Sequence, residues 1–392
     1  MNVASHGFGV GHRAMLNRDL KLVFTTNVVG SFGDGLFAYL LPVYMRNVLG
    51  ADPIQIGVLY ALTVLAAALT LLISGTLADR YDRKKVMIAG WLAWLPAPLI
   101  FAFAKNWIDM IPGMVLWGFW LGQPAGSAYI VTSAERSRLT LTFTIMSAGW
   151  SLGYVFSPAL GGYLAGTVGM KIVFYLAFIF YSSACLTLSF IKSQYANHQQ
   201  NASGEEYSFL ELLRNKKLLS MSVFFAMLMF VIMMSRNFVP TYLADVYKST
   251  DFEIGVLGSV LFASSAVLGI LLGRLGDIKR ASYSLAISLI FSAVAMVLML
   301  WSGNFGVLAL SFVLNGGSYI TWSMLSAIVG PTAPESCRAR WIAIPQTLSM
   351  LASSAAPYVG GFLYAASPQY PFICVIIAMP ILALLSVKAL KE

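Results

Sequence analysis

The sequence predicts an all-α membrane protein with twelve transmembrane helices in two pseudo-symmetric six-helix bundles. Three observations support this prediction: the composition, twelve long apolar runs, and a repeat that relates the two halves. The 392 residues are 58% hydrophobic and 10% charged, with a mean hydropathy of +0.77. Soluble domains carry about 25% charged residues. So few charges cannot cover so much apolar surface, which places the chain in a membrane.

A membrane-spanning helix needs about 20 mostly apolar residues. Twelve such runs follow one another: 21–48, 54–78, 86–104, 110–132, 142–166, 171–191, 218–245, 254–276, 283–301, 306–329, 341–365 and 371–388. A polar stretch divides them into six and six. We therefore expect a cytoplasmic N-terminal segment at 1–20, a first bundle at 21–191, a cytoplasmic linker at 192–217 and a second bundle at 218–392. The linker end, 209–217, has the pattern of a short amphipathic helix on the membrane surface.

The basic residues predict the orientation of the chain. If the N-terminus is cytoplasmic, 20 of the 25 Lys and Arg residues fall on the cytoplasmic side. The exceptions are Arg46, Lys105, Lys171 and Lys248 outside, and Arg236 within a helix. Acidic residues do not share this bias. Because Lys and Arg accumulate in cytoplasmic loops, we expect a multi-pass protein of the cell membrane with both termini inside.

Several kinds of chemistry are not expected from this residue inventory. The three cysteines are far apart and the three histidines lie in polar stretches, so neither a metal site nor an enzyme is indicated. The phosphate-binding motif G-x-x-x-x-G-K-[ST] of an ATP-driven pump does not occur. The net charge of +9 is explained by the cytoplasmic loops rather than by nucleic acid. We expect no cofactor and no metal.

The two halves of the chain are related by an internal repeat. Residues 42–79 align without a gap with 240–277, at an offset of 198 positions. Matched pairs include Pro42 and Pro240, Tyr44 and Tyr242, Val48 and Val246, and the Ile-Gly-Val-Leu runs at 56–59 and 254–257. Further along the chain, a Pro-x-x-Gly-Gly motif at 158–162 recurs at 357–361. This pattern predicts two parallel six-helix repeats, an architecture in which transporters bind substrate between the halves near the midplane.

A motif between the second and third spans carries a family resemblance. Residues 75–84 read Gly-Thr-Leu-Ala-Asp-Arg-Tyr-Asp-Arg-Lys, and a degenerate copy, Gly-Arg-Leu-Gly-Asp-Ile-Lys-Arg, occupies 273–280. The first copy resembles the G-x-L-A-D-R-x-G-R-K signature of the major facilitator superfamily, and with the repeat the resemblance covers nearly the whole chain. It implies the major facilitator fold and a cytoplasmic latch that holds the outward-open state. The implied latch residues are Gly75, Asp79, Arg80, Arg83, Lys84, Gly273, Asp277 and Arg280.

Three positions qualify the resemblance. Asp82 replaces the usual Gly of the signature, and we expect the loop to survive because Asp tolerates a left-handed backbone better than most residues. The fourth span reads Gly-Phe-Trp-Leu-Gly at 118–122, where many proton-coupled members carry a buried Arg, so a relay through that Arg is not expected. The motif at 158–162 resembles the fifth-helix motif of antiporters, with Ser157 in place of a Gly.

Two ionisable side chains, Asp34 and Arg236, lie deep within apolar spans. Each costs about 2.5–3.5 kcal/mol at a helix centre, so each is expected to face a partner or water. At the offset of 198, Arg236 is equivalent to Ala38, one turn from Asp34, and the resemblance implies that these two helices face each other across a central cavity. We predict that Asp34 and Arg236 pair there as a proton or substrate site. The alternative is a strut between the bundles without a substrate role.

Polar and aromatic residues predict a wet cavity around this pair. Asn27, Ser31 and Asp34 form one stripe of the first helix. The candidate cavity-lining residues are Asn27, Ser31, Tyr39, Gln123, Asn237, Asn315 and Gln346. Aromatic candidates are Tyr39, Trp120, Tyr129, Trp150, Tyr154, Tyr319 and Trp322. Each amide alternatively serves a helix–helix hydrogen bond, and the aromatic residues alternatively pack or face lipid.

Two mechanisms remain open on the sequence. In the first, Asp34 is the proton site, and a cationic substrate displaces its proton, giving antiport. In the second, Arg236 binds an anionic substrate and Asp34 then takes up a proton, giving symport.

The functional prediction is a secondary transporter that moves a small organic solute by alternating access, with proton-coupled efflux of a hydrophobic or cationic compound preferred. The rivals are proton symport of an organic anion bound by Arg236, and a membrane sensor or scaffold that does not transport. The expected partners are membrane lipids, the substrate and protons, and the chain is expected to be a monomer.

Overall fold

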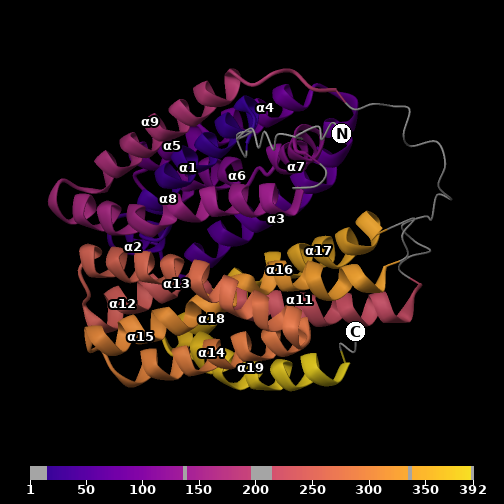
Figure 1. The fold of residues 1–392 in the computed structure, drawn as a ribbon. Helices are drawn as coiled ribbons and strands as arrows, with labels where there is room; N and C mark the ends of the chain where they lie inside the picture. The colour runs from indigo at the N-terminus through magenta and orange to yellow at the C-terminus, as the bar shows by residue number, and fades with distance from the viewer. Residues whose placement is uncertain (1–15, 136–138, 196–213, 334–337, 390–392) are drawn as a thin grey trace, which may run out of the picture.

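The structure, a computed structural model, describes residues 16–135, 139–195, 214–333 and 338–389, without the side chains at 72, 79, 139–141, 144, 338–340 and 389. Within these ranges the chain is helical and contains no strand. The helices form two groups, one above the other in Figure 1. We call them the N group and the C group.

The N group contains the first half of the chain. Its elements are α1 (Arg18–Ala38), α2 (Leu41–Asn47), α3 (Pro53–Arg80), α4 (Arg83–Trp94), α5 (Pro96–Phe103), η1 (Ile108–Met110), α6 (Ile111–Trp117), α7 (Gly122–Ser133), α8 (Leu139–Thr167) and α9 (Met170–Ser189).

The C group contains the second half. Its elements are α11 (Lys216–Arg236), α12 (Val239–Tyr247), α13 (Asp251–Ile278), α14 (Ala281–Trp301), α15 (Phe305–Asn315), η4 (Gly316–Ile320), α16 (Thr321–Val329), η5 (Gly330–Thr332), α17 (Arg338–Ser354), α18 (Ala356–Ala366) and α19 (Tyr370–Ala389).

The helices account for all twelve predicted spans. In the described part of the chain, nine helical segments are long and apolar enough to cross a membrane. The other three predicted spans are also helical, as α6 with α7, as α8, and as α17 with α18. The all-α membrane fold is therefore confirmed. Most of the predicted linker lies outside the described residues, so its boundaries and its amphipathic helix stay predictions.

The internal repeat is visible in helix geometry. Helices α3 and α13 each contain 28 residues and begin and end at positions offset by 198. Both begin with a capping box. The side chain of Asp52 or Thr250 accepts the backbone N–H of the residue three positions later, and the side chain of that residue accepts the backbone N–H of Asp52 or Thr250. Proline sets a second pair of equivalent boundaries, because it lacks the N–H that continues a helix. Pro42 lies in the first turn of α2, and Pro240 in that of α12.

Helix α7 of the N group and the end of α19 of the C group lie at the same end of the two groups in Figure 1. We call this end the terminus side, and the opposite end, which carries α2 and α12, the far side. On the far side, Arg46 Nε lies 3.5 Å from Asp245 Oδ2 and so joins the two groups by an ion pair. The Tyr364 hydroxyl donates to the same Asp245 oxygen at 3.2 Å. Exposed ion pairs contribute about 0–1 kcal/mol, so this contact adds little to the stability of the interface between the groups.

Two symmetry-related glycine contacts close the far side more tightly. A Cβ at Gly57 would collide with the carbonyl oxygen of Pro357, and a Cβ at Gly255 would collide with that of Pro158. Each contact joins the Ile-Gly-Val-Leu run of one group to the Pro-x-x-Gly-Gly motif of the other. The repeated motifs are therefore the surfaces through which the groups touch, and we call these two contacts the glycine clasps. Next to the contact of Gly255 with Pro158, Ser259 Oγ accepts a hydrogen bond from the Ala159 N–H at 3.0 Å.

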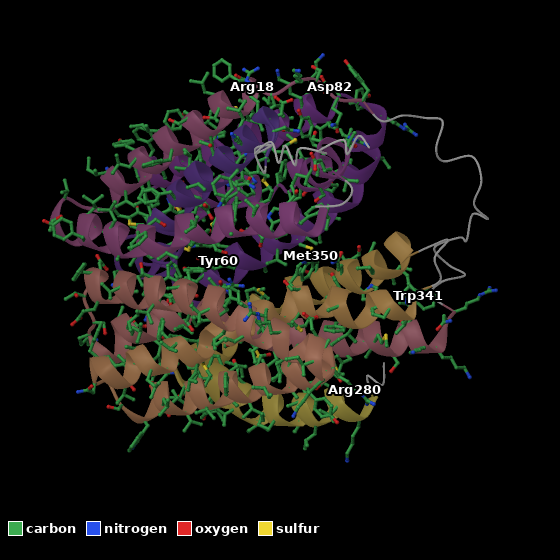
Figure 2. The ribbon with its side chains drawn as sticks, viewed as in Figure 1. Arg18, Tyr60, Asp82, Arg280, Trp341 and Met350 are labelled. Carbon is green, nitrogen blue, oxygen red and sulfur yellow. The ribbon has the colours of Figure 1, made fainter. Side chains whose placement is uncertain are left out.

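Contact between the groups reaches the middle of the molecule. Met350 of α17 packs with Ala67 and Ala68 of α3, and Figure 2 shows Met350 and Tyr60 where the two groups meet. On the terminus side, a Cβ at Gly75 or at Gly273 would meet nothing within 4 Å. Among the described residues, the close backbone contacts between the groups therefore lie on the far side, and no such contact forms at the latch glycines.

The glycine clasps make a prediction about conformation. Gly57→Ala and Gly255→Ala each introduce a Cβ against a backbone carbonyl that cannot rotate away. Both should therefore populate a state with an open far side. Double electron–electron resonance between spin labels at positions 48 and 246, in a chain without its native cysteines, should show a longer distance.

Gly166→Ala is the matched control, because a Cβ at Gly166 meets nothing within 4 Å. All three changes raise helix propensity by about 1 kcal/mol, so helix stability cannot explain a difference between them. An unchanged distance distribution in both clasp variants would contradict the interpretation of these contacts as the far-side closure.

Candidate functional site

Asp34 lies in α1, is 4% exposed, and accepts hydrogen bonds from three aromatic side chains. Trp117 Nε1 donates to Oδ1 at 2.7 Å. The Tyr181 hydroxyl also donates to Oδ1, and the Tyr154 hydroxyl donates to Oδ2. The donors come from α6, α9 and α8, all in the N group. We call these four residues the Asp34 cluster.

The local sequence explains how three helices reach one carboxylate. Asp34 is flanked by Gly33 and Gly35. A Cβ at Gly33 would collide with α9 at Phe180, and a Cβ at Gly35 would collide with α8 at Ser157. Because both glycines lack this atom, the two helices that carry Tyr181 and Tyr154 can lie against α1. Hydrogen bonds to a charged group contribute about 1.5–3 kcal/mol each, so the cluster offsets much of the cost of burying the carboxylate.

Arg236 is not the partner of Asp34, so the predicted pairing is wrong. Both side chains are described, and no ion pair within 4.0 Å joins them; the ion pair found between the groups is that of Arg46 with Asp245. The Arg236 guanidinium instead lies over the ring of Tyr319, with Cζ 3.9 Å from the ring centroid. The reason is that both Asp34 oxygens are held by donors of its own group, while Arg236 stacks on an aromatic ring of the C group. Cation–π contacts of this type contribute about 0.5–2 kcal/mol.

A chain of aromatic contacts nevertheless joins the two residues. Tyr154, which donates to Asp34, lies 4.5 Å from Phe262 of α13 between ring centroids. Phe262 lies 5.4 Å from Tyr319, on which Arg236 stacks. Phe262 also meets Tyr39 of the N group, at 6.5 Å. Phe262 therefore contacts aromatic residues of both groups, and we call the chain Tyr154, Phe262 and Tyr319 the aromatic bridge.

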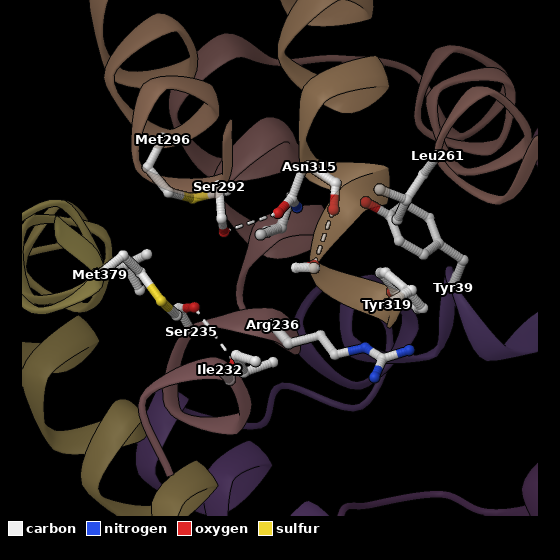
Figure 3. A pocket seen from close by; sticks show the side chains of 13 residues that line it. Tyr39, Ile232, Ser235, Arg236, Leu261, Ser292, Met296, Asn315, Tyr319 and Met379 are labelled. Carbon is white, nitrogen blue, oxygen red and sulfur yellow. Dashed lines mark hydrogen bonds between the residues drawn. The ribbon is translucent and has the colours of Figure 1, made fainter. Parts of the chain in front are cut away.

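A small cavity lies beside Arg236 (Figure 3). Its volume is about 20 Å³, which is room for about one water molecule. Tyr39 enters it from the N group, and its hydroxyl is buried without a hydrogen-bond partner among the described residues. On the C-group wall, Asn315 Oδ1 accepts from Ser292 Oγ at 3.2 Å. The structure thus brings together Arg236, Tyr39 and Asn315 from the predicted set.

The other cavity-lining candidates lie elsewhere. Ser31 is fully buried and its hydroxyl donates to a carbonyl of its own helix at 3.2 Å. Gln346 Nε2 donates to a serine of α16 at 3.2 Å, which is a contact between helices. Gln123 is exposed, and Asn27 and Asn237 are half-buried. Their functional roles remain predictions.

Among the described latch side chains, no hydrogen bond or ion pair joins the two groups. Arg83 donates to Thr132 Oγ1 and to Gln194 Oε1, both at 2.8 Å, and both acceptors belong to the first half of the chain. The Asp79 side chain lies outside the described residues. Latch contacts on the terminus side are expected only when that side is closed, whereas the described contacts close the far side.

The remaining latch candidates face outward. Arg80 of α3, Asp277 of α13 and Arg280, the residue before α14, are exposed, and Lys84 is partly exposed. Arg80 borders a hollow of about 330 Å³ on the terminus side.

Asp82 is accommodated differently from the prediction. Its φ is −56°, so a left-handed backbone is not what allows Asp in place of Gly. Asp82 is the N-cap of α4: Oδ1 accepts the backbone N–H groups of Lys84 and of Gln194, each at 3.0 Å. A carboxylate at a helix N-terminus is favourable, because it satisfies free N–H groups there. The substitution therefore anchors the end of the first half to the loop between α3 and α4.

Sequence reasoning missed three residues of this region. They are Trp117, Tyr181 and Phe262, which lie in apolar spans, where an aromatic residue is usually interpreted as one that only packs against its neighbours. The Gly-Asp-Gly run at 33–35 was the available signal, since a buried acid between two glycines indicates helices in close approach.

Comparison with known proteins decides the family. The model of the Major Facilitator Superfamily matches residues 23–250 and 221–392, which together cover most of the chain. The chain belongs to this superfamily. It is therefore a multi-pass membrane transporter of small molecules and not an enzyme, as the sequence predicts.

Two of the relatives are named as multi-drug resistance efflux pumps and a third as a quinolone resistance protein. The chain is 25% identical over 396 residues to the multi-drug resistance efflux pump PmrA of Streptococcus pneumoniae, covering 94% of this chain and 98% of the relative. It is 26% identical over 336 residues to a PmrA homolog of Lactococcus lactis, covering 82% of each chain. It is 23% identical over 309 residues to the quinolone resistance protein NorA of Staphylococcus aureus, covering 76% of this chain and 78% of the relative.

Solved structures show the same fold at low identity. A point mutant of the nucleoside transporter NupG has a TM-score of 0.78 at 15% identity, covering 95% of this chain and all of that one. A point mutant of a peptide transporter POT, in complex with sulfate, has a TM-score of 0.73 at 16% identity, covering 94% of this chain and 93% of that one. These likenesses establish the major facilitator fold.

The Asp34 cluster makes a prediction about stability. Tyr181→Phe keeps the ring and removes one donor from a buried carboxylate. We expect it to lower the free energy of unfolding by about 1.5–3 kcal/mol. Thermal unfolding of the purified protein in detergent measures this as a lower Tm.

Tyr175→Phe, on the same helix, is the matched control, because Tyr175 is not among the donors to Asp34. It should leave Tm nearly unchanged. Equal Tm values for the two variants would mean that the Tyr181 hydroxyl does not support the carboxylate.

Proposed function

We propose that this protein exports a small organic compound in exchange for protons, and that Asp34 carries the proton. The observation behind this proposal is the Asp34 cluster: a buried carboxylate midway along the apolar segment Arg18–Asn47, held by three donors rather than by a cation. Relatives named as efflux pumps support the direction of transport.

The chemistry of the cluster suits a group that gains and loses a proton. An ionised carboxylate only accepts hydrogen bonds, whereas a protonated one also donates. A tyrosine hydroxyl can donate or accept, so Tyr154 or Tyr181 can turn to accept from protonated Asp34. Trp117 can only donate and keeps one oxygen in place. The carboxyl group of Asp34 therefore has hydrogen-bond partners in both protonation states.

Proton uptake at Asp34 can be transmitted between the groups through Tyr154. This residue donates to Asp34 and also packs against Phe262 of the C group. A change in the hydrogen bond of its hydroxyl shifts the ring that contacts Phe262. In this scheme Asp34 is a proton site and does not bind the substrate, because all its contacts are taken within the N group.

The access cycle proposed here follows from the far-side closure. With its far side closed, the structure corresponds to the state that is open on the terminus side. Separation of the glycine clasps opens the far side and gives the alternate state. We propose that the terminus side is cytoplasmic, because 20 of 25 Lys and Arg residues are assigned to it. The protein then takes its substrate from the cytoplasm or the inner leaflet and acts as a monomer.

A second candidate function is uptake of an organic anion together with protons. Arg236 favours it, since its charge has no carboxylate within 4.0 Å among the described residues. The sign of the coupling separates the two functions. In proteoliposomes, an acidic interior accelerates uptake by an exchanger, and an acidic exterior accelerates uptake by a symporter.

Asp34→Asn tests the proton site. We expect it to reduce gradient-driven uptake of a panel of radiolabelled aromatic amines and acids by at least about tenfold, because Asn cannot titrate. Counterflow of the same compounds without a gradient should persist, since it requires no net proton movement.

Asp109→Asn is the matched control, because this exposed residue lies in the short helix η1, away from the Asp34 cluster. It should transport as the unmodified protein does. If Asp34→Asn keeps its response to the pH gradient, Asp34 is not the proton site. If no panel compound is taken up or exchanged by the unmodified protein, the sensor or scaffold hypothesis is favoured.

A further inference from the structure

Arg236 is a cation that faces the opposite group without a counter-ion among the described residues. Its charge interacts electrostatically with the hydroxyl groups of Tyr39, Tyr60 and Tyr154, all of the N group. Asp34 also acts on Tyr60 and Tyr154, yet lies more than 4.0 Å from Arg236. The guanidinium is half-buried rather than sealed. A charge placed this deep costs about 2.5–3.5 kcal/mol on the insertion scale, and the described partners supply no negative charge to offset it.

The contact with Tyr319 orients the guanidinium for one kind of ligand. The guanidinium carbon Cζ of Arg236 lies over the Tyr319 ring, 3.9 Å from the ring centroid. The guanidinium N–H groups form a rigid planar fork. That fork matches the two oxygens of a carboxylate, and such paired, charge-assisted hydrogen bonds are among the strongest in proteins.

The surroundings of Arg236 suit an aromatic body attached to the anionic group. Phe262, Tyr154 and Tyr319 form the aromatic bridge directly beside it, and each is half-buried. Aromatic side chains bind flat apolar ligands through edge and stacked contacts. The cavity of about 20 Å³ on the other side is too small for such a body. It offers the unpartnered Tyr39 hydroxyl as a further donor to an oxygen or a bound water.

We propose that Arg236 and Tyr319 form a carboxylate-binding subsite, and that the transported compounds include aromatic organic acids or zwitterions. The aromatic body lies against the aromatic bridge, and the carboxylate lies on the edge of the Arg236 guanidinium. This inference rests on the proposed function only in that the bound compound is a transported one. It holds for exchange and for symport alike.

Binding of a matched pair of probes tests the subsite. 2-Naphthylacetate and 2-naphthylacetamide share ring and shape and differ in charge. Calorimetric titration of the purified full chain should give a Kd for the acid at least about tenfold lower than for the amide, as expected for a bidentate charged contact. Arg236→Gln should reduce this preference to less than about twofold while leaving the Kd of the amide unchanged.

Three further variants separate the effect of the charge from that of the guanidinium geometry and from unspecific effects of substitution. Arg236→Lys retains the charge without the fork and should keep part of the preference. Tyr319→Leu should weaken acid binding, because the guanidinium loses the ring that orients it. Arg274→Gln, an exposed arginine of α13, is the matched control and should bind both probes as the unmodified protein does.

The proposal is overturned if the unmodified protein does not prefer the acid, or if Arg236→Gln keeps the preference. These outcomes leave the proposed function standing as long as Asp34→Asn abolishes gradient-driven uptake. Conversely, an acid preference that depends on Arg236, found together with unchanged gradient dependence in Asp34→Asn, supports the subsite and rejects Asp34 as the proton carrier.

Discussion

The structure depends on keeping a carboxylate inside an apolar bundle. Asp34 has no cation beside it among the described residues, and three aromatic donors from three different helices replace the water it would otherwise need. This requirement fixes the packing of the N group, because α8 and α9 must approach α1 closely enough for Tyr154 and Tyr181 to reach. The glycines on either side of Asp34 permit that approach. A buried acid thus organises its half of the molecule as well as offering a site for a proton.

The second constraint is the way in which two similar halves meet. The same pair of motifs occurs in each half, and each motif contacts the other kind across the interface through a backbone carbonyl and a glycine. Contacts of this kind are close, and they do not depend on long side chains. They can form and separate as units, as alternating access requires. The aromatic bridge also links Asp34 of one half to Arg236 of the other.

Much of the fold was accessible from the sequence for physical reasons. Spans follow from length and hydropathy, and the equivalent starts of α3 and α13 follow from a repeat that holds its register through loops. Asp34 and Arg236 stood out because charge inside a membrane is expensive. Their pairing was wrong because depth along a helix does not give the direction in which a side chain points. The donors to Asp34 are 83, 120 and 147 residues away along the chain, and no periodicity relates them to it.

The central claim, that Asp34 changes its protonation state during transport, can be observed directly. Infrared difference spectroscopy between ligand-free and ligand-bound protein detects the carbonyl stretch of a protonated carboxyl group. The account predicts a band in the protonated-carboxyl region that changes when a transported compound binds and is missing in Asp34→Asn. The same difference spectrum in both proteins would contradict it.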